Sequence, residues 1–504
     1  MPILSEAFST ADTVDASRPW PRHLVDGNLW RDLACLLGDG ALTLAGFWGD
    51  VGTVHMALLD VSGPDIAIAS LVCDNGKFPS VAAHHIPAIR LERAIQDLYG
   101  YEATGSPDPR PWLDHGRWPM RAPLGSRTET RAAVPAYEFL TAEGDGLHQI
   151  PVGPVHAGTI EPGHFRFSAS GETIVRLEER LGYTHKGVEG MLTGASLDRA
   201  ASLAARTSGD STVAYSIAFA RAVEGALGVE VPARGVWLRA LMAELERVAN
   251  HLGDIGAICN DASFALMHAQ TGILRERVLR ASLACFGHRL MMDRVVPGGT
   301  SADLTGSGET HLRSLLATIR NAFPELIELY DNTASIQDRT VGTGALRAEL
   351  VRQYGCGGFV GRASGRSFDA RRDVVYPPYD QLRFETPLLT EGDVNARVWI
   401  RIREVEQSLG LIDQILIRIA SGEFRAEVAH VGEPREGLAL VEGFRGDILA
   451  WVRLDSDGAV ARSHVRDPSW FQWPLLEAAI EGNIVADFPI CNKSFNCSYS
   501  GHDL

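Results

Sequence analysis

The chain has 504 residues, of which 45% are hydrophobic and 22% are charged, so it is long enough for more than one domain with a real core. Its formal net charge of −16 argues against nucleic acid as a partner, because phosphate binding needs a basic face. No stretch approaches the roughly 18 uninterrupted apolar residues of a spanning helix, and the N-terminus lacks the features of a signal peptide. We therefore expect a cytoplasmic protein without a transmembrane segment of its own.

Residues 1–125 are predicted to form a small α+β domain. Three short β-like runs, ALTLAGFWG, TVHMALLDV and DIAIASLVC, are separated by Gly and Asp. The stretch IPAIRLERAIQDLYG then has the pattern of an amphipathic helix that ends at Gly100. The polar residues 126–150 are predicted to be a linker to a larger domain at residues 151–504.

The larger domain begins with a predicted strand–turn–strand unit at residues 151–182 and becomes mostly helical after about residue 195. In residues 393–420 apolar side chains recur in steps of four and three, which predicts one long helix with Asp393 as its N-cap. A core helix of a bundle fits better than a free coiled coil, since Ile415 and Ile417 broaden the apolar face. Residues 438–467 return to a β-like pattern, so the predicted fold class is α+β with a helix-bundle core.

Seven motifs occur in order between residues 153 and 470: GPVHAGTIEPGHFRF, LGYTHKGVEGML, ELERVANHLGDIGAICND, VPGG, GRASGRSFDARRDVVYPPYD, FRGDILAWV and DPSW. Together they resemble the large subunit of energy-converting nickel–iron hydrogenases of the formate hydrogenlyase type, and the 49-kDa family of respiratory complex I. The stretch from HHIPAIRLERAIQDLYG to SPDPRPWLDHG also resembles the 30-kDa family of complex I. The resemblance implies a 30-kDa-subunit-like domain at residues 1–125, fused to a hydrogenase-large-subunit-like domain at residues 151–504.

In active hydrogenases of this family, nickel and iron are held by four thiolates from an R-x-C-G-x-C segment and a C-terminal D-P-C-x-x-C. The resemblance places Ser208 and Ser211 at the first two ligand positions, and Cys497 and Ser500 at the last two. A hydroxyl is a hard, weak ligand compared with a thiolate. We therefore expect no nickel–iron centre and no H2 chemistry by this chain. The retained motifs still predict that these four side chains converge on one point.

The remaining cysteines offer no replacement for the missing ligands. None of the seven belongs to a C-x-x-C pair, the commonest signature of a zinc or iron–sulfur site. Cys491 would lie roughly 20 Å from Cys497 in an extended strand, so both are interpreted as small buried thiols. The sequence also ends four residues after Ser500, where hydrogenases of this type carry an extension that is cleaved during metal insertion. This ending agrees with the expectation of a protein that is never loaded with metal.

The complex I resemblance implies a quinone pocket, in which a histidine hydrogen-bonds the quinone, an aspartate pairs with that histidine and a tyrosine donates to the headgroup. His164 and Asp261 match the first two residues and are the candidate catalytic residues. The tyrosine position falls on Gly209, and Tyr215 is no clear substitute. A carboxylate beside an imidazole fixes its tautomer and favours its protonated form, which suits proton delivery to a carbonyl oxygen. The alternative is that both residues only cap or bridge local structure.

Other charged motif residues have two interpretations. Glu244, Arg247 and His251 lie on one predicted helix and could face one partner, although a solvated face with an internal ion pair is the more common arrangement. The arginines of GRASGRSFDARRD lie near the cavity in the family, or they form a surface ion-pair network. For His156 and His185 a structural role and a catalytic role are equally open.

The resemblance implies the large core subunit of a membrane-associated, multi-subunit, complex I-like oxidoreductase. We expect no cofactor bound by this chain; a quinone is the candidate ligand, and a 4Fe–4S cluster would lie on a partner small subunit of the complex I 20-kDa type. Ion-translocating membrane subunits are the other expected partners, at the inner face of the cell membrane. Two alternatives stay open, an active formate hydrogenlyase-type hydrogenase and a redox-silent scaffold. NADH binding has no support, since no G-x-G-x-x-G follows a strand.

Overall fold

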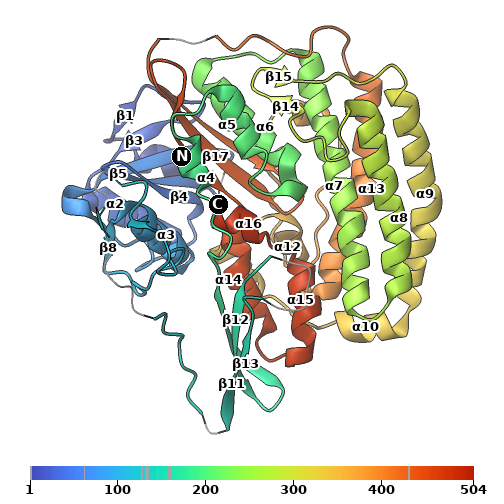
Figure 1. Cartoon of the computed structure of the whole chain (residues 1–504), viewed down its shortest axis with the longest axis horizontal. Helices are drawn as coiled ribbons and strands as arrows, with labels where there is room; N and C mark the ends of the chain where they lie inside the picture. Colours follow the sequence, from blue (N-terminus) through green and yellow to red (C-terminus); the bar gives the residue numbers. More distant parts are fainter. Residues whose placement is uncertain are drawn as a thin grey trace.

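The computed structural model describes residues 3–61, 63–125, 129–130, 136–144, 146–155, 161–429 and 432–504 (Figure 1). Five strands of the N-terminal part form one sheet in the order β1-β3-β6-β5-β4. Their bounds are Asp12–Val14 (β1), Arg22–Leu24 (β3), Leu42–Asp50 (β4), Thr53–Asp60 (β5) and Ile66–Val72 (β6). The three predicted β-like runs are thus confirmed as β4, β5 and β6.

Helices cover this N-terminal sheet. They are α1 (Ile3–Ala7), α2 (Gly27–Gly38) and α3 (Ile89–Tyr99), and both α2 and α3 contact β4. Helix α3 ends at Gly100, which has a left-handed backbone (φ 75°) that a residue without a side chain adopts at low cost. The predicted helix end is therefore confirmed.

A second sheet joins the two parts of the chain. Its order is β18-β17-β16-β2, and β2 (Ser17–Arg18) comes from the N-terminal part and pairs in parallel with β16. The other strands are Arg435–Glu442 (β16), Asp447–Leu454 (β17) and Val460–Arg466 (β18). Helix α6 (Thr212–Leu227) packs on β16 and β17, and Ala45 and Trp48 of β4 belong to the same buried apolar cluster. The domain boundary drawn from the sequence therefore stays a prediction.

Four long helices stand side by side at the edge of the molecule opposite the N-terminal sheet (Figure 1). They are α7 (Ala233–Asp261), α8 (Ala265–Phe286), α9 (Gly308–Asn332) and α13 (Val394–Arg418). The Asp393 side chain accepts from the Ala396 amide at 2.7 Å, so the predicted N-cap and the predicted bundle helix are confirmed. Ile415 is buried, as predicted. Ile417 was predicted to belong to the same apolar face, but it is 75% exposed.

The segment that follows the predicted linker forms a three-stranded antiparallel sheet, which extends from one end of the molecule (Figure 1). Its strands are β11 (Leu147–Val152), β12 (His164–Ser170) and β13 (Thr173–Arg180), so β11 covers the last residues of that linker. The C-terminal helices α14 (Ser469–Ile480), α15 (Phe488–Phe495) and α16 (Tyr499–Asp503) lie between this sheet and the bundle. This arrangement places the C-terminal segment with Cys497 and Ser500 near the centre of the molecule.

Shorter elements connect these layers. The strands are Lys77–Pro79 (β7), Glu102–Thr104 (β8), Met120–Arg121 (β9), Glu129–Thr130 (β10), Val295–Val296 (β14) and Gly299–Thr300 (β15). The helices are Val188–Leu192 (α4), Leu197–Ala204 (α5), Ala334–Thr340 (α10), Ala348–Gln353 (α11) and Gly358–Ala363 (α12).

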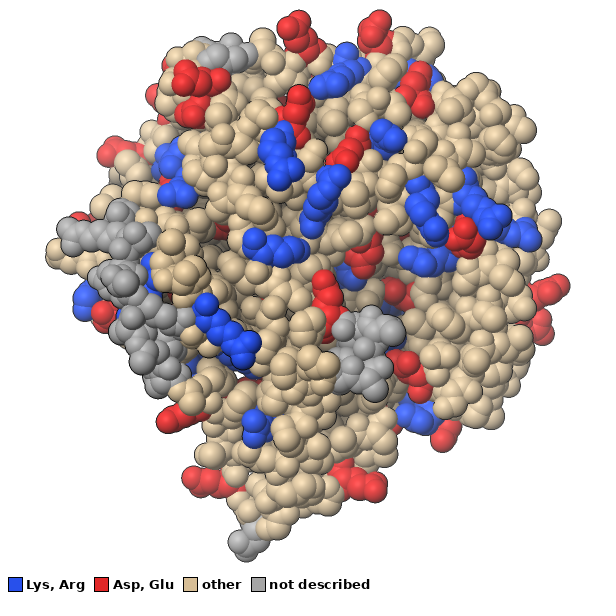
Figure 2. All heavy atoms as spheres, viewed as in Figure 1, with Lys and Arg blue, Asp and Glu red and all other residues tan. Residues whose placement is uncertain are grey.

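Two further features of the structure are the distribution of charge on one face and the apolar character of the helices. On the face shown in Figure 2, basic side chains alternate with acidic ones and with uncharged surface, so this face carries no continuous basic patch. Within the described ranges, no helix has both the length and the apolar character needed to cross a membrane.

Candidate functional site

The two segments that carry the degenerate ligand positions meet in space. The Ser208 and Ser498 hydroxyl oxygens are 2.9 Å apart although 290 residues separate them, and Ser498 Oγ is 3.5 Å from Ser500 Oγ. Ser208, Cys497 and Ser500 line one cavity of about 310 Å³. We call it the central cavity. Three of the four predicted positions, from segments far apart in the sequence, thus line the same cavity.

Ser211 joins this cavity through an arginine that the sequence interpretation missed. Arg445 Nη1 donates to Ser211 Oγ at 3.1 Å and to Asp210 Oδ1 at 2.7 Å, and Arg445 Nη2 donates to Asp210 Oδ2 at 2.6 Å. Arg445 also donates to the Asn496 carbonyl, so it bridges both segments. Burial alone would raise the pKa of Asp210, but the Arg445 guanidinium outweighs it and keeps that pKa below its ordinary value. A fixed ion pair therefore stands at the wall of the cavity.

The donor atoms of the central cavity do not fit a nickel–iron group. Burial raises the pKa of the Cys497 thiol well above its ordinary value, and the nearby Glu179 carboxyl adds to this shift. A protonated thiol and three hydroxyls are poor ligands for metals that need soft thiolates. Cys491 is buried outside the cavity lining, and burial raises its pKa to about 11. In the described part of the chain, no group of three or more His, Cys, Asp or Glu side chains could hold a metal ion.

Further polar residues complete the cavity lining. Glu161 Oε2 accepts from the Ser500 amide at 3.0 Å, and Lys493 and Asn496 line the same space. Glu161 and Arg445 both lie within motifs that carry the family resemblance, EPGHFRF and FRGDILAWV. Their place in these motifs was the signal that could have identified them. Their contacts depend on chain segments hundreds of residues away, which no local pattern indicates.

His164 occupies a different hollow from the one predicted. It is the first residue of β12, and it lines a hollow of about 330 Å³ together with Tyr137 and Arg180. His164 Nδ1 lies 3.1 Å from the Gly153 carbonyl, and Nε2 accepts from Arg166 Nε at 3.2 Å. Burial lowers the pKa of His164. Both ring nitrogens are therefore engaged by the residues around β12.

Asp261 is the last residue of α7, and its charge interacts with that of Lys493, which lines the central cavity. Burial raises its pKa, which the charges of Lys493 and His268 partly offset. Among the described residues, no hydrogen bond or ion pair joins Asp261 to His164. His164 is bonded within its own sheet and Asp261 has Lys493 as a charged neighbour, so their predicted approach, direct or through a water, stays a prediction. Tyr215 donates to Asp467 in the core, so it does not replace the missing tyrosine.

The charged face of α7 is buried, contrary to the solvated helix face that we judged more common. Glu244, Arg247 and His251 are at most 1% exposed. Glu404 on α13 is the partner of the last two, 2.8 Å from His251 Nε2 and 3.4 Å from Arg247 Nη1, whereas Glu244 pairs with Arg247 at 3.6 Å. Burial alone would raise the pKa of Glu404, but Arg362, His251 and Arg247 hold it well below its ordinary value.

Two arginines of the GRASGRSFDARRD motif belong to the same charged cluster. Arg362 donates to Glu404 and Glu442, and Arg371 donates to Glu244 at 3.0 Å. The surface interpretation is thus wrong for these two, whereas Arg372 is exposed. We call the whole set the buried ion-pair network; its members are Glu244, Arg247, His251, Arg362, Asp369, Arg371, Glu404 and Glu442.

The buried ion-pair network lies between the central cavity and a surface hollow. On the cavity side, Asn496 donates to Asp254 at 2.9 Å, and Asp254 accepts from Arg401 at 3.2 Å, one turn from Glu404 on α13. On the other side, Arg371 lines an open hollow of about 800 Å³. His185 belongs to neither group, since its Nδ1 lies 2.7 Å from the Asp503 carbonyl, and His156 lies outside the described residues.

Comparisons with known proteins agree with the motif resemblance. Residues 262–440 match the family model "Respiratory-chain NADH dehydrogenase, 49 Kd subunit". Formate hydrogenlyase subunit 5 of Escherichia coli K12 is 31% identical over 437 residues, which are 85% of this chain and 77% of that protein. The chain therefore belongs to the family that contains formate hydrogenlyase large subunits and complex I 49-kDa subunits.

Fused relatives and a solved structure extend the match. The C/D fusion protein of NADH-quinone oxidoreductase from Bacteroides thetaiotaomicron is 28% identical over 463 residues, 87% of each chain. Hydrogenase-4 component G of Escherichia coli K12 is 29% identical over 484 residues, 94% of this chain and 83% of that protein. A chain of the membrane-bound sulfane sulfur reductase, an archaeal respiratory membrane complex, superposes with a TM-score of 0.67 at 25% identity, over 72% of this chain and all (100%) of that one. The α+β fold class predicted from the sequence is confirmed.

Proposed function

We propose that this chain is the large core subunit of a membrane-associated, complex I-like oxidoreductase that transfers electrons without a nickel–iron centre. Membership of a family of oxidoreductase subunits supports the class of activity. The observation that carries the proposal is the central cavity, which brings the former ligand positions together but lines them with hydroxyls and the Arg445–Asp210 pair.

The lining of the cavity suits a small polar electron acceptor better than a metal. Arg445 and Lys493 supply positive charge, and the Ser208 and Ser500 hydroxyls can donate or accept hydrogen bonds. A cation beside a reducible oxygen stabilises the negative charge that develops as electrons arrive. Glu161 lies at the same wall, where a carboxyl group could exchange the accompanying proton.

The expected partners follow from the class of complex. Electrons would arrive from a 4Fe–4S cluster on an iron–sulfur small subunit, and a quinone is the candidate acceptor. The chain would lie on the cytoplasmic face of the membrane, next to ion-translocating subunits. The buried ion-pair network would relay a change of charge from the cavity to the hollow lined by Arg371. His164 and Asp261 stay predictions as site residues.

Turnover of the purified complex with a reductant and a short-chain quinone analogue tests this proposal. Arg445→Met should lower turnover by more than tenfold, because a cation at the reacting centre is worth several kcal/mol, on the order of 10²-fold in rate. The control Arg280→Met changes an arginine whose side chain is 78% exposed and should have no effect. An Arg445→Met complex that assembles and turns over at the normal rate would contradict the proposal. Absence of turnover in the unmodified complex would favour the scaffold alternative.

A further inference from the structure

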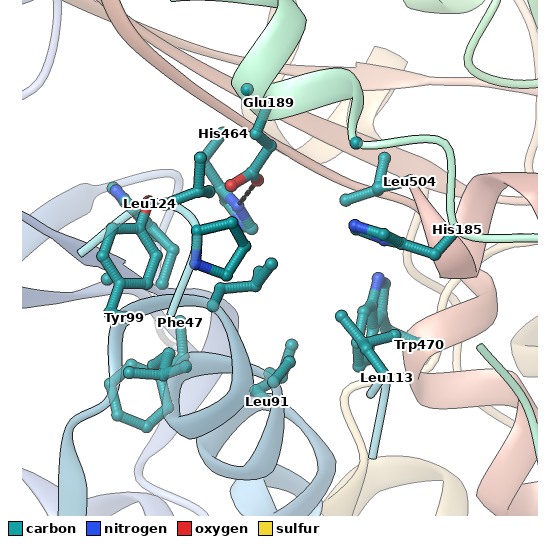
Figure 3. A pocket seen from close by; sticks show the side chains of 18 residues that line it. Phe47, Leu91, Tyr99, Leu113, Leu124, His185, Glu189, His464, Trp470 and Leu504 are labelled. Atoms are coloured by element: carbon teal, nitrogen blue, oxygen red, sulfur yellow. Dashed lines mark hydrogen bonds and ion pairs between the residues drawn. The ribbon is translucent and has the colours of Figure 1, made fainter. Parts of the chain in front are cut away.

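A second cavity lies where the N-terminal sheet and α3 meet the larger domain (Figure 3). Its volume is about 160 Å³, and it shares no lining residue with the central cavity. We call it the interdomain cavity. Most of its wall is apolar, with Phe47, Leu91, Leu113 and Leu124 from one side and Leu504 from the other. A closed apolar cavity of about 150 Å³ in another protein holds one benzene molecule, so this space has the size of a single aromatic ring.

Three nitrogen atoms of side chains that line this cavity are buried and have no hydrogen-bond partner among the described residues. They are Trp48 Nε1, Trp470 Nε1 and His464 Nε2, on residues that are 2%, 4% and 8% exposed. Buried polar groups are rarely left in this state, because each unmade hydrogen bond costs free energy. Figure 3 shows the Trp470 indole nitrogen directed into the cavity below His185.

The chemistry of these atoms is specific. The two indole nitrogens can only donate. His464 Nδ1 lies 2.6 Å from Glu189 Oε1, and in the tautomer that directs its Nδ1 proton at this carboxylate, Nε2 is the nitrogen that can accept. The wall thus offers donors and an acceptor to a ligand hydroxyl. Glu189 is the acidic side chain of this lining, and its carboxylate disfavours an anionic ligand such as a phenolate.

The geometry points to a binding site for one small, neutral, monocyclic aromatic alcohol of the phenol class. Its ring would fill the apolar space, and its hydroxyl would accept from Trp470 Nε1 and donate to His464 Nε2. Water alone fits less well, because a buried water needs two to four polar partners close together and most of this wall is apolar. The site is independent of the redox activity proposed above, and its ligand would contact both domains.

Three substitutions separate the contributions to this site. Trp470→Phe removes the indole donor and keeps an aromatic ring. Trp473→Phe is the matched control, because its Nε1 is also buried without a partner but it does not line the cavity. Gly190→Leu fills the space, since Gly190 borders the cavity and a Cβ there would meet Leu124 Cδ2 at an ordinary 3.5 Å.

Calorimetric titration of the full chain in its complex, with phenol and with benzene as probes, tests the inference. We expect one saturable phenol site per chain. Trp470→Phe should weaken phenol binding about five- to tenfold and leave benzene binding unchanged, because only the hydrogen bond is lost. Trp473→Phe should change neither, and Gly190→Leu should abolish both. No saturable phenol binding, an equal effect of Trp470→Phe and Trp473→Phe, or normal binding by Gly190→Leu would overturn the inference.

Discussion

The central cavity and the buried ion-pair network are neighbours, yet they hold their charges in different ways. In the cavity, the buried Arg445 pairs with an aspartate whose side chain is 37% exposed, and Ser208 bonds to that aspartate and to Ser498. In the network, Glu404 and Arg362 are at most 1% exposed and each has several charged partners. Removing one charged partner should therefore lower the free energy of unfolding only slightly in the cavity, and by much more in the network. We therefore expect the cavity to tolerate substitutions that the network does not.

The network should show the largest effect. Glu404→Ala should lower the free energy of unfolding by about 3–5 kcal/mol, because it leaves Arg362 and His251 buried without their shared carboxylate. Denaturant unfolding of the purified chain measures this change. The control Glu276→Ala breaks exposed ion pairs and should cost at most about 1 kcal/mol. If both substitutions lowered the free energy of unfolding equally, the proposed difference between buried and exposed ion pairs would be wrong.

Glu246 on α7 should make stability depend on pH. Burial raises its pKa to about 8, although the Val213 and Ala214 amides donate to its carboxylate. The folded chain therefore keeps this proton up to about pH 8, whereas the unfolded chain releases it near its ordinary value of 4.5. Between these values folding takes up a proton, so the free energy of unfolding falls as pH rises, by up to a few kcal/mol.

Glu246→Gln should flatten this decrease when unfolding is measured from pH 5 to pH 8. The control Glu349→Gln changes a side chain that is 80% exposed and should keep the wild-type slope. A Glu246→Gln chain that loses stability with pH as steeply as the wild type would show that another group titrates in this window.

The Arg445–Asp210 pair should show an intermediate effect. Asp210→Asn keeps the shape of the side chain but removes its charge, which should cost about 1–2 kcal/mol because the aspartate is partly in contact with solvent. The matched control is Asp293→Asn, which weakens the exposed pair with Arg206 and should cost less than about 1 kcal/mol. A decrease in the free energy of unfolding as large as that for Glu404→Ala would mean that the cavity excludes water as fully as the network does.

The cavity serines should show the smallest effect. Ser500→Ala removes one long neutral hydrogen bond, 3.5 Å to the Ser498 hydroxyl, and should cost at most about 1 kcal/mol. Ser408→Ala, which removes a buried 2.6 Å hydrogen bond to the Glu244 carboxylate, should cost about 1.5–3 kcal/mol. The reverse order in thermal or denaturant unfolding would contradict the distinction between the two regions.

Local patterns in the sequence predict the elements well. The period of apolar residues located α13, and Asp393 and Gly100 marked a helix start and a helix end. Burial of charge was not predictable in this way, because Glu244 and Arg371 become buried only through partners far apart in the chain. Ile417 follows the apolar pattern but is exposed, since position on a helix does not reveal which face finds a neighbour.

The candidate site was predictable only through the family motifs. They located the meeting of Ser208 with the segment around Cys497, which no composition or periodicity indicates. The same motifs suggested the pair of His164 with Asp261, whereas the ring nitrogens of His164 contact Gly153 and Arg166. A motif thus predicts the path of the backbone better than the partner of one side chain.

Elemental analysis of the complex, purified from cells grown with added nickel, tests most directly whether the central cavity has lost its metal. One buried, protonated thiol and three hydroxyls should bind no nickel–iron group, so nickel should be far below one atom per chain. Any iron should be accounted for by clusters on the partner subunits. One nickel per chain, lost when Cys497 is replaced by Ala, would contradict the central claim.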